Sequence, residues 1–470
     1  MQEIRLFNTL SHTKETFVPL ESLCVTMYQC GPTVYSTQHI GNLRAAVMGD
    51  LVVRALRHLG YTVTFVRNYT DVGHLTSDED EGEDKLEKGA KRESMSPEAI
   101  AEKYIRQYED DIAALNIMPP SVAPRATEHI EDIITMVSSL ITKGYAYTTD
   151  LAVYFDVSQA KDYTRLSGQD EDALRAGAGT GEVSDPAKKT PRDFALWFFK
   201  AGAHARALQT WSSPFSSPLV QHGEGFPGWH IECSAMSNTY LGATMDIHMG
   251  GIEHVSVHHT NEIAQSEGAN GVPPARYWMH NEHLLVDNTK MSKSQGTGYA
   301  LDDICSHGYN PLALRYFFLQ AHYRSKQNFT WEALDAASRG LQKLYVAMRE
   351  FPRENTASPH QETMKRFDTA LADDINVPQA LAVAHEILSS QISPTEKGAT
   401  LIAMDSVLGL GLAEQTSVEI PSDILSLVHE REAYRARGDY ANADRMRDEI
   451  KAKGYEIKDT PEGARAVRIS

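Results

Sequence analysis

Cysteine, histidine and glutamate residues at four positions have the chemistry of metal ligands. Cys30 and Cys233 stand 203 positions apart. His258 and Glu262 are four residues apart and would share one face of a helix. Thiolate, imidazole and carboxylate are groups that zinc accepts, and these four would complete a tetrahedral set, with His259 as a competing ligand. Spacing alone leaves another interpretation open, in which the cysteines are buried thiols and the histidine is a solvated helix residue.

Three further histidines lie near these candidate ligands in the sequence. They are either hydrogen-bond donors behind the ligands or surface groups, and they are His230, His248 and His254. The other two cysteines fit a core role, because Cys24 lies in a β-prone run and Cys305 in a short amphipathic segment.

Two other short motifs have the chemistry of phosphate binding. The tetrapeptide from His39 to Asn42 stands where a loop is expected to enter a helix, so the positive helix end and polar side chains would face an anion together. Lys290 and Lys293 lie in a Lys-Met-Ser-Lys-Ser segment followed by two glycines, which would let two positive charges approach a triphosphate. Either motif alone is compatible with chance or with a solvated turn. Together, in this order, they favour a nucleotide site.

The segments around these motifs predict alternating strands and helices. A β-prone run at 24–28 precedes a helical apolar pattern at 42–59, which Gly60 ends, and a second β-prone run follows at 62–66. Strand, helix and strand in this order are typical of a parallel crossover unit, so the predicted fold class is α/β.

The alternating pattern is interrupted and then resumes. Residues 98–143 are predicted to be helical, whereas 144–220 are irregular and contain Gly-rich and Ser-Pro steps, which indicates an insertion. Helix, strand and helix patterns return at 229–241, 245–248 and 255–267. The sheet is therefore predicted to be split by the insertion.

From Trp331 onward the pattern is helical and poor in strands. The predicted helices cover 331–350, 361–373, 378–391, 397–410, 421–437 and 439–453. We expect them to form a helical bundle and a small terminal module. The acidic run at 78–84 is expected to be a solvated surface loop without chemistry of its own.

The composition is that of a multi-domain globular protein. The chain has 470 residues, 41% of them hydrophobic and 23% charged, and a formal net charge of −18. This charge argues against a histone-like or polybasic membrane-surface role but leaves room for a local basic groove. Four scattered cysteines are too few for a disulfide framework, and the sequence lacks a signal-like N-terminus and any apolar stretch of about 18 residues. We therefore expect a protein of the reducing cytoplasm.

The two phosphate motifs resemble the HIGH and KMSKS signatures of class I aminoacyl-tRNA synthetases. Segments 28–35, 228–236 and 258–266 resemble the cysteinyl-tRNA synthetase family in particular, and the resemblance runs essentially from end to end. It implies a Rossmann-like parallel-sheet catalytic domain split by an insertion, an α-helical bundle and a small C-terminal anticodon-binding module. The corresponding boundaries are 1–115 and 221–330 for the catalytic halves, 116–220 for the connective insertion, 331–415 for the bundle and 416–470 for the module.

The resemblance also implies an activity, which is ATP-dependent activation of L-cysteine to cysteinyl adenylate and transfer to the 3′ end of cysteine tRNA. Zinc selects the substrate thiol in that family, and its implied ligands here are Cys30, Cys233, His258 and Glu262. The implied catalytic residues are His39, Asn42, Lys290 and Lys293. ATP with Mg²⁺ is expected at His39, Gly41, Asn42 and Lys293, and the amino acid at Cys30, Thr33 and Trp229.

Three places depart from the family motifs. Asn42 stands where the last HIGH histidine is usual, and Thr297 stands where asparagine usually follows the KMSKS glycine. The sequence of 248–257 differs from the glycine-rich sequence that is usual in the family before the histidine pair. The amide of Asn42 still donates a neutral hydrogen bond, although it cannot carry charge as an imidazolium can. We therefore expect activation to be retained, whether or not its rate is altered.

The acidic net charge stands against a tRNA partner, because Lys and Arg contacts with phosphates dominate nucleic-acid affinity. Residues 431–470, however, hold ten basic and eight acidic residues, so the tail is basic relative to the whole. Its candidate phosphate-binding and base-stacking residues are Arg435, Arg437, Arg445, Arg447, Tyr434 and Tyr440. A solvated helical hairpin explains the same residues equally well.

Two other functions stay open at this point. A cysteine ligase of the mycothiol pathway resembles the same core, but it usually lacks the anticodon-binding end, which would leave 361–470 unexplained. A catalytically silent tRNA-binding paralogue is motivated by Asn42 and Thr297, whereas the retained lysines and ligands argue for an enzyme. A monomer with no membrane and no obligate protein partner is the default expectation.

Overall fold

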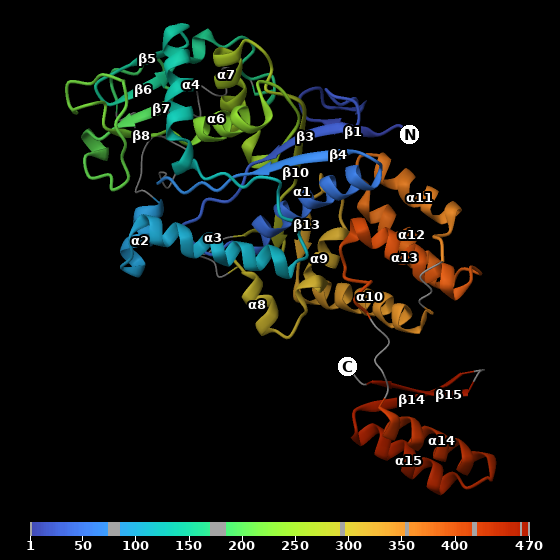
Figure 1. The fold of residues 1–470 in the computed structure, drawn as a ribbon. Coiled ribbons are helices and arrows are strands. Elements are labelled where there is room, and N and C mark those ends of the chain that lie inside the picture. The colour runs from blue at the N-terminus through green and yellow to red at the C-terminus, as the bar shows by residue number, and fades with distance from the viewer. Residues whose placement is uncertain are drawn as a thin grey trace.

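A four-stranded parallel sheet forms the centre of the larger part of the molecule (Figure 1). The structure is a computed structural model that describes residues 2–73, 85–169, 185–291, 297–352, 357–415, 421–460 and 463–468. In the spatial order β10–β9–β3–β4, the strands are β3 (Cys24–Gln29), β4 (Thr62–Arg67), β9 (Met245–Gly251) and β10 (Ala275–Asn281). The predicted α/β class, with a parallel sheet split by an insertion, is confirmed.

Helix α1 (Ile40–His58) connects β3 to β4. His39 caps its amino end by accepting a hydrogen bond from the backbone amide of Asn42. At the other end Gly60 has a φ of 100°, a conformation that glycine adopts without strain. The helix predicted at 42–59 and its flanking strands are confirmed.

The two faces of this sheet pack against different helices. Val25 and Met27 of β3 belong to the largest apolar cluster, which includes the buried side of α1. Tyr28, which points to the opposite face, packs in a second cluster with α6 (Trp229–Leu241) and α7 (His258–Asn270). Successive side chains of β3 therefore point alternately into these two apolar clusters.

The chain order creates a switch point at the middle of the sheet. After β3 the chain continues to β4 on one side, and it later returns to β9 on the other side of β3. Open parallel sheets bind ligands in the crevice outside the carboxyl ends of the strands at such a point. The fold therefore predicts a site where β3 and β9 end.

The insertion carries a sheet of its own, so the prediction that 144–220 is irregular is wrong. Its sheet has four antiparallel strands, β5 (Ala146–Thr148), β6 (Ala152–Phe155), β7 (Phe194–Phe199) and β8 (Gly225–Pro227), the last of which lies just beyond the predicted end of the insertion at residue 220. Every residue of β6 and β7 is buried, because one face packs with α4 (Ile130–Thr142) and the other forms a separate apolar cluster. A strand buried on both faces shows no polar alternation by which sequence reasoning could detect it.

The remaining helices of the larger part pack in the same apolar cluster as α1 and lie below the parallel sheet in the view of Figure 1. The short strands of this part are β1 (Arg5–Asn8), β2 (Thr13–Thr16), β11 (Leu284–Val286), β12 (Thr289–Lys290) and β13 (Gln327–Phe329). Its other helices are α2 (Lys85–Glu93), α3 (Pro97–Ala114), α8 (Leu301–Ser306), α9 (Pro311–Leu319), α10 (Trp331–Glu350), α11 (Gln361–Ala372), α12 (Val377–Ser389) and α13 (Pro394–Leu408). The helices predicted from residue 331 to 410 are confirmed.

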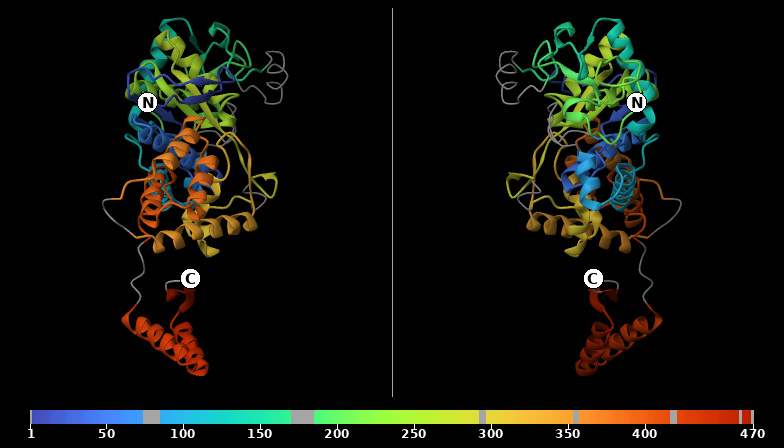
Figure 2. Two further views of the ribbon diagram at one scale, coloured as in Figure 1. Left: turned by 90° about the vertical axis from the view of Figure 1, so that its right-hand side faces the viewer. Right: turned by 90° about the vertical axis from the view of Figure 1, so that its left-hand side faces the viewer.

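A small C-terminal module lies apart from the rest of the molecule (Figure 2). It consists of α14 (Ser422–Ala436), α15 (Tyr440–Ala452), β14 (Tyr455–Thr460) and β15 (Gly463–Arg468). The helices agree with the predictions, but the antiparallel pair β14–β15 was not predicted. The five domain boundaries stay predictions. Among the described residues, no helix has both the length and the apolar character that crossing a membrane requires.

Candidate active site and metal centre

A cavity of about 280 Å³ opens at the switch point of the parallel sheet. It is lined by Gln29, Cys30, Gly31, Pro32, Thr33, Gln38, Asn42, Ala45, Ala46, Arg67, Tyr108, Trp229, His230, Gly250, Gly251, Glu253, His254, Val257 and His258. These residues come from the ends of β3, β4 and β9, the start of α1, and α3, α6 and α7. The cavity therefore joins the candidate metal ligands to the helix that carries the first phosphate motif.

Cys30 is held where β3 ends. Its backbone amide donates to the carbonyl of Met249 at 3.2 Å, so pairing with β9 continues past the strand. The next amide, of Gly31, donates to Asn68 Oδ1 at 2.9 Å, and a Cβ at this glycine would lie 1.6 Å from the carbonyl oxygen of Asn68. Only glycine allows this approach of the two strand ends, which fixes the neighbouring thiol at the mouth of the cavity.

Helix α6 brings the second thiol to the same place. A Cβ at Gly228, the residue that precedes the helix, would lie 2.1 Å from the carbonyl oxygen of Ala195 in β7, so the glycine lets the helix start against the insertion sheet. Cys233 follows in the second turn, is 2% exposed and lies 3.9 Å from Asn68 Oδ1. The insertion thus positions a residue that is 203 positions away from the first cysteine.

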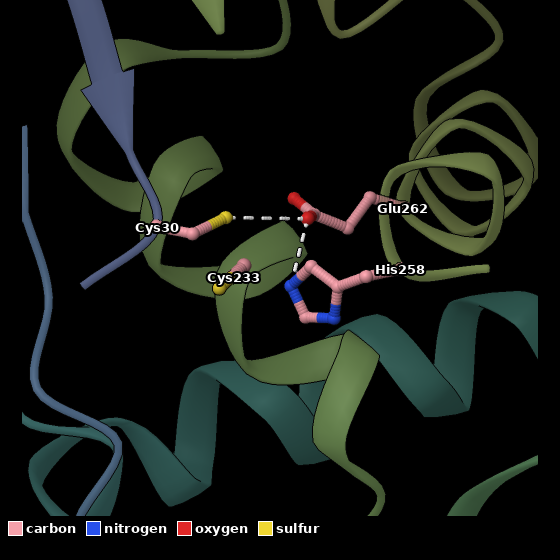
Figure 3. A group of neighbouring side chains, drawn as sticks. All are labelled: Cys30, Cys233, His258 and Glu262. Atoms are coloured by element: carbon pink, nitrogen blue, oxygen red, sulfur yellow. Dashed lines mark hydrogen bonds and ion pairs between the residues drawn. The ribbon is translucent and has the colours of Figure 1, made fainter. Parts of the chain in front are cut away.

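Helix α7 supplies the other two candidate ligands. His258 Nε2 and Glu262 Oε1 lie 3.0 Å apart across one helical turn, as their spacing predicted, and Cys30 Sγ lies 3.7 Å from the same oxygen. The four ligand atoms, including Cys233 Sγ, lie within 4.8 Å of one another. Figure 3 shows the four side chains converging from β3, α6 and α7. This donor set of two thiols, one imidazole and one carboxylate has the composition of a zinc site.

Two of the three neighbouring histidines contact the ligands from behind. His248 Nε2 donates to Glu262 Oε2 at 2.8 Å, and His230 Nδ1 lies 2.8 Å from His258 Nδ1. Both side chains are buried, so neither is a surface group. His254 is half-buried and its ring lies 5.0 Å from that of His258.

A second set of donors overlaps the first. Cys30 Sγ lies 3.3 Å from His259 Nε2, and the thiol, His259, His248 and Glu262 also place their ligand atoms within 4.8 Å of one another. His259 Nδ1 is 2.7 Å from His280 Nε2. His280 was not predicted as a site residue. The available signal was its place near the end of β10, at the same edge of the sheet as the cysteine.

Burial and mutual contact move the pKa values of these side chains in different directions. A hydrogen bond with Cys30 lowers the pKa of Cys233 to about 7, while burial and its neighbour raise the pKa of Cys30. Burial would raise the pKa of Glu262, but His248 and His258 lower it overall. Burial opposes the charge of His258, yet mainly Glu262 raises its pKa to about 10. Because metal ligands must be deprotonated, binding an ion here would release the proton of this imidazolium.

The two phosphate motifs meet at the start of α1. The amide of Ile40 donates to the carbonyl of Tyr299 at 2.8 Å, just beyond the lysine motif. A Cβ at Gly41 would lie 3.5 Å from Met291 Cε, which belongs to that motif, and 3.0 Å from the ring of His39. Asn42 donates through its side chain to Gln38 and lines the cavity. Met291 and the segment after the lysine motif therefore lie against the amino end of α1.

The two predicted lysines are described unequally. Lys290 is described by its backbone, which pairs with Leu285 in the β11–β12 ladder, and Lys293 lies outside the described residues. Two predicted amino-acid contacts are at the cavity. Thr33 lines it and bridges to Thr70, while the indole of Trp229 lies 4.9 Å from the ring of His258.

The chain is similar to known proteins along nearly its whole length. Residues 16–339 match the family described as the tRNA synthetases class I (C) catalytic domain. The chain is 45% identical to cysteine–tRNA ligase 1 of Burkholderia lata, over 98% of this chain and 96% of the relative. It is 41% identical to a cysteine–tRNA ligase of Thermus thermophilus, over 98% of both chains. The chain belongs to the cysteine–tRNA ligase family of class I tRNA synthetases.

A solved structure of low sequence identity shows a similar fold and nothing beyond the fold. The structure of Mycobacterium tuberculosis methionyl-tRNA synthetase in complex with methionyl-adenylate superposes with a TM-score of 0.54 at 14% identity, covering 86% of this chain and 94% of the other. Family membership and fold therefore agree with the resemblance stated from the motifs. The match to relatives along 98% of the chain includes the C-terminal module.

Proposed function

We propose that this chain is a cysteine–tRNA ligase, which activates L-cysteine with ATP and transfers it to the 3′ end of cysteine tRNA. The observation that carries the proposal is the cavity at the switch point, which places the candidate zinc ligands beside the amino end of α1. We call α1 the signature helix because the HIGH-like motif lies at its start. Membership of the cysteine–tRNA ligase family supports the same activity.

The donor set fits one zinc ion held by Cys30, Cys233, His258 and Glu262. We prefer this set to the overlapping one because it contains both thiols, and because His248 is engaged with the outer oxygen of the glutamate. Bound zinc would supply a Lewis acid that accepts the thiolate of cysteine as a further ligand. A pocket selecting by shape alone separates ligands that differ by one small group by only about 1–3 kcal/mol, so a required bond makes an editing domain unnecessary against serine.

The chain's own residues would stabilise the charge that develops during activation. The carboxylate of cysteine attacks the α-phosphorus of ATP, so no protein nucleophile is needed. His39, Asn42 and the amino end of α1 face the α-phosphate, with Gly41 giving the backbone close access. The lysine motif, with Mg²⁺, holds the departing β- and γ-phosphates, and we assign this role to Lys290 and Lys293. Thr33 and Trp229 would enclose the amino acid.

The C-terminal module supplies a surface for the tRNA partner. Arg437, Arg445 and Arg447 are exposed there, and Tyr440 is 67% exposed, so phosphates and unstacked bases can reach them. The cytoplasm and a monomeric state belong to the same proposal.

The test is transfer of labelled cysteine to total tRNA by purified, zinc-replete protein with ATP and Mg²⁺. Charging is expected with cysteine and not with serine, and cysteine-dependent exchange of pyrophosphate into ATP is expected without tRNA. Exchange without charging, with tRNA of verified quality, would move the assignment to a small-molecule cysteine ligase. The absence of both reactions would leave a silent tRNA-binding protein.

A further inference from the structure

Arg67 is the last residue of β4, and its side chain lines the cavity at the switch point. The residue is only 2% exposed, yet neither Nη1 nor Nη2 has a hydrogen-bond partner among the described residues. The guanidinium lies 5.6 Å from the ring centres of both Phe65 and Tyr108, and these ring faces accept no conventional hydrogen bond. A buried cation thus lines the cavity with both of its terminal nitrogens unpaired within the described part of the chain.

Two other buried arginines show how the same protein normally satisfies this side chain. Arg44 donates to three backbone carbonyls and to the side chain of Gln327. Arg315 donates to the carboxylate of Asp50 and to backbone carbonyls. Both are 0% exposed. Leaving a buried charged donor without a partner is costly, so Arg67 stands out as a group whose partner comes from outside the chain.

The position of Arg67 indicates the chemistry of that partner. Gln29 and Arg67 are paired across β3 and β4, and the candidate zinc ligand Cys30 directly follows β3, so the guanidinium and the candidate ligand cluster border one cavity. Asn42, at the amino end of α1, borders it too. A guanidinium offers parallel donors that match a carboxylate or a phosphate. Both reactants of the proposed activation carry such an oxyanion.

We propose that Arg67 binds an oxyanion of the small-molecule substrates in this cavity. The inference rests on the proposed function, and it assigns to the site a cationic contact that neither signature motif supplies. The oxyanion has two possible sources, the carboxylate of cysteine and the phosphates of ATP. Ligands that lack one of these groups show which of the two Arg67 binds. Cysteamine is cysteine without its carboxylate, and adenosine is ATP without its phosphates.

The experiment is calorimetric titration of zinc-loaded protein with L-cysteine, cysteamine, ATP and adenosine, comparing the parent with Arg67→Met. The parent is expected to prefer cysteine to cysteamine and ATP to adenosine. Arg67→Met is expected to reduce one of these two preferences by roughly 10–100-fold, the usual size of a lost charge-assisted pair, without changing the affinity for the truncated compound. Which preference falls identifies the oxyanion.

Two matched variants separate recognition from folding and from net charge. Arg57→Met removes one positive charge from the exposed end of α1, where the side chain donates to the carbonyl of Val63, and should change neither preference. Arg67→Lys keeps the charge and the aliphatic stem, so it should fold even where Arg67→Met does not, and should show a smaller loss in the same preference.

Unchanged preferences in a folded Arg67 variant would overturn the inference and leave a structural arginine satisfied by water. An equal loss for all four compounds would do the same, since it would indicate a distorted cavity. Binding is measured without tRNA or turnover, so failure of tRNA charging in the parent would reject the proposed function without deciding the role of Arg67.

Discussion

The cavity at the switch point and the C-terminal module place their charged groups in opposite ways. His258 and Glu262 form a contact in which the side chains are 4% and 2% exposed, whereas the ion pair of Lys453 with Asp423 in the module is 43% and 59% exposed. The buried contact depends on three separate elements, β3, α6 and α7, for its surroundings. The exposed pair needs only two neighbouring segments of one small unit.

This difference in burial suits the two regions to different partners. Charges inside a low-dielectric cavity interact strongly but tolerate few geometries, which suits selection of one small molecule. Exposed charges are weakened by water and salt but act on any large partner that comes near, which suits a polyanion. Variants that remove groups from one region at a time test this division.

Removing one thiol should disable the buried region almost completely. In Cys233→Ser we expect zinc after dialysis to fall from about one ion per chain to below about a tenth, and cysteine-dependent pyrophosphate exchange to fall at least about 1,000-fold, because a hydroxyl is a poor zinc ligand. Metal analysis and the exchange assay measure the two losses. The control is Cys305→Ser, because this thiol is exposed and the core role predicted for it from the sequence is wrong. Full zinc content in the Cys233 variant would contradict the ligand assignment.

Deleting the module should separate the two regions functionally. A chain ending at residue 415 should keep cysteine-dependent pyrophosphate exchange within about twofold, but lose tRNA charging by at least about 100-fold, the size of a few lost stacking and phosphate contacts. Exchange and charging assays on the same preparation measure this. The full-length double variant Arg445→Gln, Arg447→Gln, which changes two exposed side chains, should show a weaker loss that grows with salt. Equal loss of both activities would break the comparison.

The hydrogen bond behind Glu262 should tune the metal without removing it. His248→Gln loses the imidazole that donates to Glu262 Oε2 at 2.8 Å, so zinc affinity should fall roughly 10–100-fold while the four ligands remain. Competition with a chelator of known affinity, at constant pH, measures the change. His283→Gln is the control, because that half-buried histidine lies 3.7 Å from exposed Glu253 and outside the donor sets. Unaltered affinity in the first variant would show that this bond does not hold the ligand.

The smallest predicted effect concerns pH. Burial, with Asp110 and Asp302 nearby, raises the pKa of Asp111 to about 6 from 3.8. The unfolded chain therefore loses this proton at lower pH than the folded chain, so stability falls as pH rises from about 4 to 6. Asp111→Asn should raise the free energy of unfolding by about 1 kcal/mol at pH 8, after allowance for partial exposure, and by little at pH 4.

Thermal unfolding at both pH values measures this gain, which should appear as a degree or two in Tm for the larger part of the molecule. Asp423→Asn in the module is the matched control. Its ion pair with Lys453 is exposed, so we expect no gain at either pH. A similar pH-dependent gain in both variants would show that burial does not distinguish the regions.

Periodicity and turn residues made much of the fold predictable from sequence. Helix α6 has the predicted bounds, 229–241, because glycines flank it: Gly228 precedes it, and Gly242, with a φ of 80°, ends it. Helix α7 starts three residues later than predicted, at His258, because Ile252–His254 form a short 3₁₀ turn ahead of it. Strand β7 was missed because a strand buried on both faces shows no alternation.

The site was predictable only where chemistry is concentrated in a motif. His258 and Glu262 share a helix face, so their contact follows from spacing, whereas Cys30 and Cys233 meet only because the sheet and the insertion fold. Residue types and spacing made these four residues candidates, and the family resemblance decided between ligands and buried, non-ligating thiols. Arg67 is the one charged residue of β4, and nothing in its local sequence indicates that it lines a cavity.

The bond between the amide of Ile40 and the carbonyl of Tyr299 has a consequence for sequence variation. Both groups belong to the backbone, so the hydrogen bond between α1 and the segment after the lysine motif does not depend on which side chains these two residues carry. Many residues can replace the tyrosine without breaking it. The isoleucine is different, because proline, which is ordinarily welcome at the first position of a helix, has no amide hydrogen. A substitution that helix statistics would class as benign would therefore disconnect the two motifs.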